Sequence, residues 1–80
     1  MPLYFFHLRD SVDILLDPEG RELSGADAIP EAALKEARWI IGHEAMSGRI
    51  RLDQRIDVED EFKNVLHSVN FVDAVEIVHP

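Results

Sequence analysis

The segment that decides the fold is residues 27–48, which read DAIPEAALKEARWIIGHEAMSG. Its apolar residues recur along one side at helical spacing. They are Ile29, Ala33, Ala37, Ile40, Ile41 and Ala45, with Leu34 beside them. Asp27 is suited to cap the start of a helix, Pro30 is tolerated in a first turn, and Gly48 is suited to end it. The pattern predicts one amphipathic helix over residues 29–47, and its alanines indicate close approach to a sheet.

Four strand-like segments flank this helix, two on each side. They are residues 3–9, 14–16, 55–59 and 65–71. Their β-branched and aromatic residues favour extended structure. Between the first pair and the helix, residues 17–20 (DPEG) have the composition of a type I turn, and residues 21–23 return briefly to extended structure. Residues 72–80 are expected to form a short helix or a last strand segment, docked because their apolar side chains need cover.

The order of these elements predicts an α+β fold of the type β-β-α-β-β. Two hairpins around one helix imply an antiparallel sheet of three to four strands with the amphipathic helix packed on one face. Eighty residues suffice for a single domain, so we assign residues 1–80 to one. The opposite face of the sheet must then be solvated or covered by a partner, and Phe5 and His7 lie on one candidate side of it.

The opening PLYFFHLRD, residues 2–10, resembles the start of a family of small domains of unknown function from alphaproteobacteria, especially rhizobia. Family members continue with an Asp-x-x-Gly turn, like residues 17–20, an Ala-rich helix, like residues 32–45, and an acidic-edged hairpin, like residues 55–71. Where the family hairpin often turns on Asp-Glu-x-Gly, this chain has DEFKN, so Asn64 is expected to supply the left-handed residue. The resemblance implies a bacterial cytosolic protein of this element order. It lends no catalytic residues, because the family has no established activity.

The composition narrows the classes of partner. Sixteen acidic residues against eight basic ones give a net charge of −8, which repels phosphate backbones and anionic membranes. No nucleic-acid or membrane partner is therefore expected. The absence of cysteine excludes disulfides and thiolate metal sites. The opening lacks the pattern of a signal peptide, and no stretch approaches the ~20 apolar residues of a membrane-spanning helix, so a cytoplasmic location is expected.

Two groups of residues are candidates for chemistry. His7 and His67 each lie in the middle of a strand, and with the right register they could sit side by side and bind a metal with a nearby carboxylate. The alternative is that each is an ordinary histidine with a hydrogen-bond partner. Asp57 and Glu59 share one face of a strand and could bind a hard cation, but we favour a role in protecting a sheet edge from pairing. No nucleophile motif, catalytic triad or phosphate loop is present, so no catalytic residue, no cofactor and no enzymatic activity are expected.

The leading hypothesis is a protein-interaction or regulatory module that forms a homodimer through the free sheet face or an edge strand. The candidate interface residues are Phe5, His7 and Trp39. Trp39 stands at the edge of the helical stripe, where it either packs into the core or anchors an interface. Two alternatives stay open. One is a metal-binding or small-ligand protein using His7 and His67, and the other is an acidic, antitoxin-like partner of a basic protein.

Overall fold

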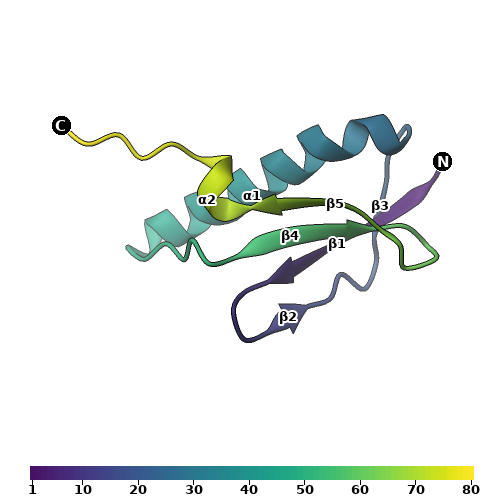
Figure 1. The fold of residues 1–80 in the computed structure, drawn as a ribbon, viewed down its shortest axis with the longest axis horizontal. Coiled ribbons are helices and arrows are strands. Elements are labelled where there is room, and N and C mark those ends of the chain that lie inside the picture. Colours follow the sequence, from purple (N-terminus) through teal and green to yellow (C-terminus); the bar gives the residue numbers. More distant parts are fainter.

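The computed structural model describes residues 1–80 and arranges them as a sheet with one long helix on one face (Figure 1). The elements are β1 (Leu3–Arg9), β2 (Ile14–Leu15), β3 (Arg21–Glu22), α1 (Ile29–Met46), β4 (Arg55–Glu59), β5 (Val65–Asn70) and α2 (Phe71–Ala74). The strands pair in the order β2-β1-β4-β5, and β3 also pairs with β1. All pairings are antiparallel. The predicted α+β class and element order are confirmed.

Strand β1 lies inside the sheet because both of its edges are used. One edge pairs with β4 over its last five residues. The other pairs with β3 near its start and with β2 near its end. Directly opposed residues of antiparallel strands share a face. The pairs Phe6↔Val58 and Leu8↔Leu15 therefore place four apolar side chains on the side of the sheet that carries α1.

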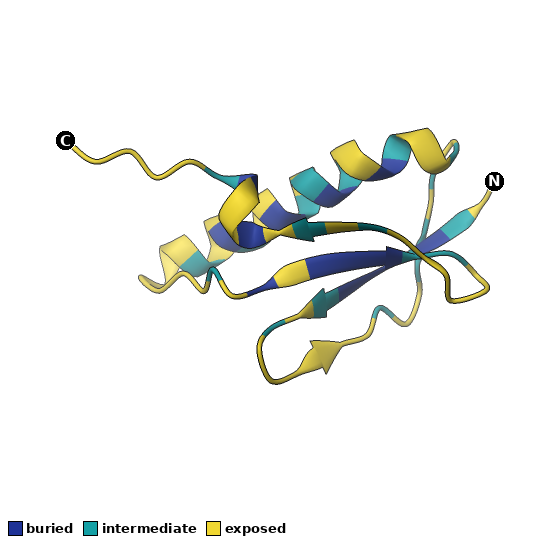
Figure 2. Cartoon of the chain, in the orientation of Figure 1, coloured by how far each residue is buried: buried dark blue, intermediate teal, exposed yellow.

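The core lies between α1 and the sheet (Figure 2). It consists of Tyr4, Phe6, Ile29, Ala33, Ala37, Ile41, Ile56, Val58, Phe71 and Ala74. Ala33 and Ala37 are completely buried, as expected for a helix that approaches a sheet closely. Helix α1 packs over β4 and β5. It leaves the same face of β1 and β2 partly uncovered, which is where the candidate site described below is found.

The two ends of α1 differ from the prediction in part. Asp27 does not cap the helix. It lies in a 3₁₀ turn, Ala26–Ala28, and the backbone carbonyl of Ala26 accepts the N–H of Ile29, which a cap at Asp27 would have bound. Gly48 does end the helix, with φ +88° and an N–H that donates to the carbonyl of Ala45. Ala45 itself is exposed, because the last turn of α1 projects beyond the strands (Figure 1).

The segment after β5 follows the prediction in part. The strand ends at Asn70, and Phe71 begins the short helix α2, with its N–H donating to the carbonyl of Gln54 at 2.9 Å. The short helix that was one of the two expected outcomes therefore forms, and Phe71, Ala74 and, in part, Val75 pack into the core. The expected docking is wrong only for residues 76–80, which are exposed and extend away from the body of the protein (Figure 1).

The β4–β5 turn uses a different residue from the one expected. Lys63, not Asn64, adopts the left-handed conformation, with φ 66°. Asn64 instead closes the turn against Asp60: its backbone N–H and its side-chain amide both donate to the Asp60 carboxylate, at 2.9 and 3.0 Å. Asn64 is held by these hydrogen bonds at the end of the turn, and the positive φ is adopted by Lys63, one residue earlier. Neither helix of the fold has the length and apolarity needed to cross a membrane.

Candidate functional site

The face of the sheet opposite α1 carries a hydrogen-bonded polar layer centred on Asp57. This buried carboxylate accepts hydrogen bonds from Arg55 Nε at 3.1 Å and Ser68 Oγ at 2.7 Å, and it forms an ion pair with Arg9, whose Nε lies 2.9 Å from Asp57 Oδ2. Burial alone would raise the pKa of Asp57, but the Ser68 hydrogen bond and the two guanidinium groups outweigh it and hold the pKa below its ordinary value. The edge-protecting role predicted for Asp57 and Glu59 is wrong, because β4 is an inner strand with a neighbour on each side.

His7 belongs to the same face and has both ring nitrogens engaged. Nδ1 accepts the backbone N–H of Asp17 at 3.0 Å, and Nε2 lies 3.5 Å from Glu59 Oε1. The ring is stacked beside Phe5, with centroids 6.3 Å apart. His7 is buried and Phe5 half-buried, so this pair offers little free apolar surface. Their role as interface residues stays a prediction.

The pairing register separates the two histidines of the metal hypothesis. His7 is opposite Asp57, whereas His67 is opposite Val58, the next residue of β4. Successive residues of a strand point to opposite faces, so the two imidazoles lie on opposite sides of the sheet. The expectation that they sit side by side is therefore wrong. No three His, Asp or Glu side chains gather elsewhere in a metal-binding arrangement.

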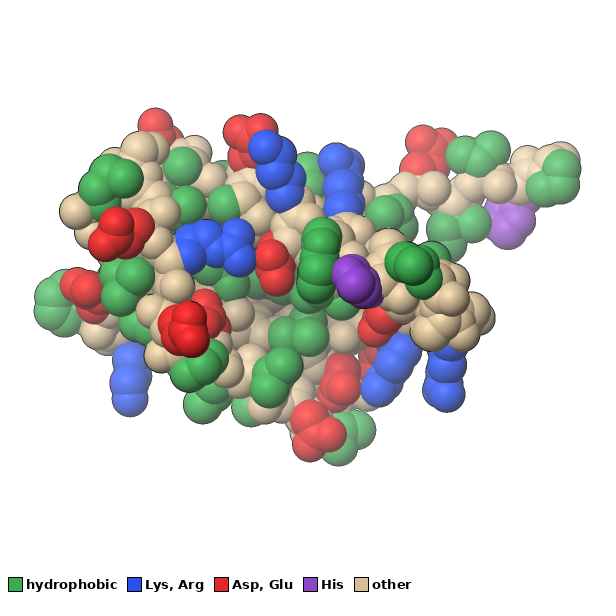
Figure 3. All heavy atoms as spheres, turned by 180° about the vertical axis from the view of Figure 1, so that it is seen from behind, with side chains coloured by type: hydrophobic (Ala, Val, Ile, Leu, Met, Phe, Trp, Pro, Cys, Tyr) green, Lys and Arg blue, Asp and Glu red, His purple; other side chains and the backbone are tan.

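An apolar groove with a volume of about 530 Å³ lies instead on the α1 side of the sheet. We call it the Trp39 groove. Its floor is formed by Phe6, Leu8, Ile40 and Ile56, which are buried or half-buried. The groove exists because α1 covers β4 and β5 but not β1 and β2. Figure 3 shows hydrophobic side chains gathered around a hollow on this face, with acidic and basic side chains around them.

The walls of the groove are large exposed apolar side chains. On the helix side, Trp39 is 61% exposed and its ring lies against His43, with centroids 4.1 Å apart. On the sheet side, Leu15 and Leu16 are 69% and 60% exposed. Of the two roles weighed for Trp39, core packing is wrong. The side chain projects from the solvent-facing edge of α1, where the helix surface turns toward the uncovered strands.

One part of the groove is polar. Arg21 Nη2 donates to Glu36 Oε1 at 3.0 Å, which links β3 to α1. The same guanidinium lies 4.3 Å from the centroid of the Phe6 ring, within the range of a cation–π contact. Arg21 therefore contacts both Glu36 on α1 and Phe6 in the groove floor, and Glu36 neutralises its charge. Asp17 is the third charged residue of the lining, and seven of the eleven lining residues are hydrophobic.

Asp17 holds the sheet-side wall in place. Its carboxylate accepts three backbone N–H groups, from Phe6 at 3.1 Å, Glu19 at 3.2 Å and Gly20 at 3.1 Å. Partial burial raises the pKa of Asp17, but the hydrogen bonds from Gly20, Phe6 and Glu19 outweigh it and lower the pKa overall. The predicted turn at residues 17–20 is thus anchored by its first residue to the central strand β1.

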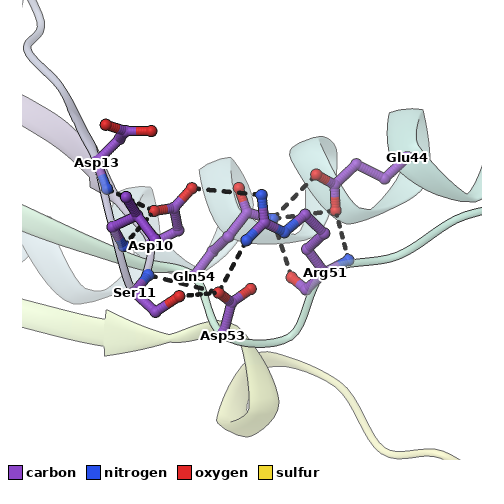
Figure 4. A network of polar contacts seen from close by, with 8 residues as sticks. Asp10, Ser11, Asp13, Glu44, Arg51, Asp53 and Gln54 are labelled. Atoms are coloured by element: carbon purple, nitrogen blue, oxygen red, sulfur yellow. Dashed lines mark hydrogen bonds and ion pairs between the residues drawn. The ribbon is translucent and has the colours of Figure 1, made fainter.

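A second polar cluster joins the β1–β2 loop to the α1–β4 loop (Figure 4). Arg51 is its hub, with Nη2 at 3.0 Å from Asp53 Oδ2 and Nη1 at 3.5 Å from Asp10 Oδ2. Ser11 Oγ donates to Asp53 Oδ2 at 2.9 Å, and Gln54 Nε2 donates to Glu44 Oε2 at 2.9 Å. These groups bond to one another, so the cluster acts as a clamp between two loops.

Residues 3–72 match the family described as domain of unknown function DUF6894. The chain belongs to this family. No curated protein and no solved structure matches it. The DUF6894 match includes every residue that lines the Trp39 groove and leaves out the second half of α2 and the residues that follow it. The expected membership of a domain-of-unknown-function family is confirmed; the bacterial group and the cytoplasmic location stay predictions.

Sequence reasoning identified one member of the groove, Trp39, and missed the rest of this DUF6894 surface. The missing signal lies in the apolar run Ile14-Leu15-Leu16, which is longer than the two-residue strand β2. Leu16 continues that apolar run after the pairing has ended and so needs a different partner. This additional apolar residue, together with a tryptophan at the edge of the helical stripe, is the pattern that could have predicted an apolar surface between the strand and the helix.

Proposed function

We propose that this protein is a non-enzymatic interaction module that self-associates through the Trp39 groove. The single observation that carries the proposal is a tryptophan, 61% exposed, facing two exposed leucines across an apolar floor. Tryptophan is enriched among the residues that dominate binding energy at protein interfaces. The free energy falls when another apolar surface covers a groove of this kind and excludes water from it.

A non-enzymatic role is supported by how the titratable groups are used. The Asp17 carboxylate accepts three backbone hydrogen bonds, and the Asp57 carboxylate accepts hydrogen bonds from Arg55 and Ser68 and pairs with Arg9. Both nitrogens of His7 are also engaged. A general acid or base needs a free position facing a substrate. In this fold these groups stabilise strands and turns.

The proposal is tested by sedimentation velocity from low to high micromolar concentration. We expect the wild-type chain to shift from monomer to dimer, and Trp39→Ser to stay monomeric. Phe62→Ser is the matched control, because Phe62 is also a large exposed aromatic residue but lies in the β4–β5 turn, away from the groove. A wild-type chain that stays monomeric throughout, or a dimer that Trp39→Ser leaves intact, would contradict the proposal.

Salt separates this function from that of an acidic partner of a basic protein. Two copies of a chain with net charge −8 repel each other, so added salt should strengthen self-association through an apolar groove. Capture of a basic protein by the same negative charge should weaken with salt. Sedimentation of the pure chain should therefore show more dimer at high salt than at low salt. Capture of a basic protein should instead decrease between the same two salt concentrations.

A further inference from the structure

The structure has a second exposed apolar feature besides the Trp39 groove. It is the segment of residues 75–80, VEIVHP, which follows α2. Ile77 and Val78 are 61% and 79% exposed. Val75 already has extended backbone, with φ −137° and ψ 155°, and the segment projects away from the body of the protein (Figure 1). We call this segment the tail.

We propose that the occupant of the Trp39 groove is the tail of a second copy of this chain. The inference rests on the proposed self-association and adds which segment makes the contact. An extended segment presents alternate side chains in opposite directions. Ile77 can then face the apolar floor while Val78 faces a wall. Two β-branched side chains leave water on binding, and the segment is already extended, which lowers the ordering cost.

The place where the tail leaves the body argues against binding to its own groove. Arg38 Nε donates to the carbonyl of Ala74 at 2.8 Å, so the tail starts beside Arg38 on α1. Of the α1 residues that line the groove, Glu36 and Ile40 lie about 160° around the helix from Arg38, and Trp39 lies about 100° from it. The groove and the start of the tail therefore lie on different sides of α1.

The position of the apolar residues in the tail supports the same conclusion. Val78 is four residues beyond Ala74, which is about 13 Å of extended chain. A path of 160° around a helix about 10–12 Å in diameter is about 14–17 Å long, so Ile77 and Val78 fall short of Ile40 in the groove floor of their own chain. A second copy has no such restriction. With one groove and one tail each, two copies related by a two-fold axis exchange tails reciprocally and form a closed dimer.

The first test removes the apolar side chains of the tail in the full chain. The tail variant is Ile77→Ser with Val78→Ser, and its matched control is Val12→Ser, an exposed valine in the β1–β2 loop that does not line the groove. Sedimentation velocity should show a monomer for the tail variant and wild-type dimerisation for the control. A tail variant that dimerises like the wild type, while Trp39→Ser is monomeric, would overturn the tail inference and leave the proposed function standing.

The second test is complementation. The tail variant keeps an intact groove, and Trp39→Ser keeps an intact tail. Mixed together, they should form a dimer with one tail-to-groove contact, weaker than the wild-type dimer. Trp39 is the only tryptophan of the chain, so the mixture reports only on the intact groove of the tail variant. We expect its emission to shift to shorter wavelength when the Trp39→Ser chain is added. An unshifted emission would show that the grooves do not receive tails.

The two tests keep the inference and the proposed function distinguishable. A wild-type chain that is monomeric at high micromolar concentration contradicts both. A wild-type dimer that depends on Trp39 but shows no complementation contradicts the tail inference alone and indicates groove-to-groove packing. Circular dichroism of each variant, compared with the wild type, establishes that the loss of association does not come from unfolding.

Discussion

Nδ1 of His7 accepts the backbone N–H of Asp17 at 3.0 Å, and the Asp17 carboxylate in turn accepts the N–H of Phe6 at 3.1 Å. These bonds cross the place where the sheet edge is interrupted. Strands β2 and β3 both pair with β1, but residues 16–20 between them pair with nothing. Side-chain atoms of His7 and Asp17 replace the missing backbone partners. They also fix the segment that forms the sheet-side wall of the Trp39 groove.

Asp17→Ala should destabilise the fold by about 1–3 kcal/mol, because three backbone N–H groups lose their acceptor at once. The measurement is urea unfolding followed by circular dichroism. Asp13→Ala is the control: Asp13 lies in the same region, is exposed, and makes no side-chain hydrogen bond. Equal midpoints for the two variants would show that Asp17 does not anchor the turn.

Stability should fall in acid partly through Asp57. Its pKa is lowered in the folded protein, so its ionised form contributes stability above the unfolded Asp pKa of about 3.9, and this contribution is lost as the pH falls through the folded value. Asp57→Asn should therefore be less stable than the wild type at pH 7, with a gap that narrows toward pH 3. Urea titrations at several pH values measure the gap, and a gap independent of pH would contradict this assignment.

Two glycines should respond to alanine in opposite directions. Gly20 has φ +74°, and an added Cβ would lie 2.9 Å from the Phe5 ring and 3.0 Å from the Tyr4 carbonyl, so Gly20→Ala should destabilise by more than about 1 kcal/mol. Gly42 lies within α1 with open space where its Cβ would be. Gly42→Ala should stabilise by about 0.5–1 kcal/mol. Thermal unfolding of both variants checks the pair, and a shift of the same sign would refute it.

Ala37→Leu should destabilise by about 1–3 kcal/mol, because Ala37 is fully buried where α1 meets the sheet and a larger side chain forces the layers apart. Ala45→Leu is the matched control on the exposed last turn of the same helix, where alanine and leucine have similar helix propensities. Denaturant unfolding should leave the control within about 0.5 kcal/mol of the wild type. A tolerated Ala37→Leu would mean that the layers are not closely packed.

Local patterns in the sequence were sufficient for much of the fold. The helical spacing from Ile29 to Ile41 predicted α1 and its buried side, and Gly48 predicted where it ends. The β-branched and aromatic residues of 3–9 and 55–59 predicted β1 and β4 with the bounds that the structure has. These features depend on residues close in sequence, where periodicity and turn chemistry act directly.

The candidate site depended on contacts that local patterns do not contain. Trp39 was recognisable as a stripe-edge residue, but its partners Leu15 and Leu16 are more than twenty residues away. The shared face of His7 and Asp57, and the opposite placement of His67, follow from the strand register. Register shifts of one residue exchange the two faces of a strand, so no single-strand pattern decides which side chains meet.

The sequence by itself determined the α+β class, the element order, the buried side of α1 and the acidic surface, because spacing, propensity and charge are properties of neighbouring residues. Only the tertiary structure decided that α1 covers β4 and β5 and leaves β1 and β2 open, that Asp57 lies inside the sheet, and that residues 76–80 are undocked. The physical reason is that α1 could bury the same apolar stripe against different pairs of strands, and only the packing of the whole chain selects one of these positions. The Trp39 groove is the surface that this choice leaves uncovered.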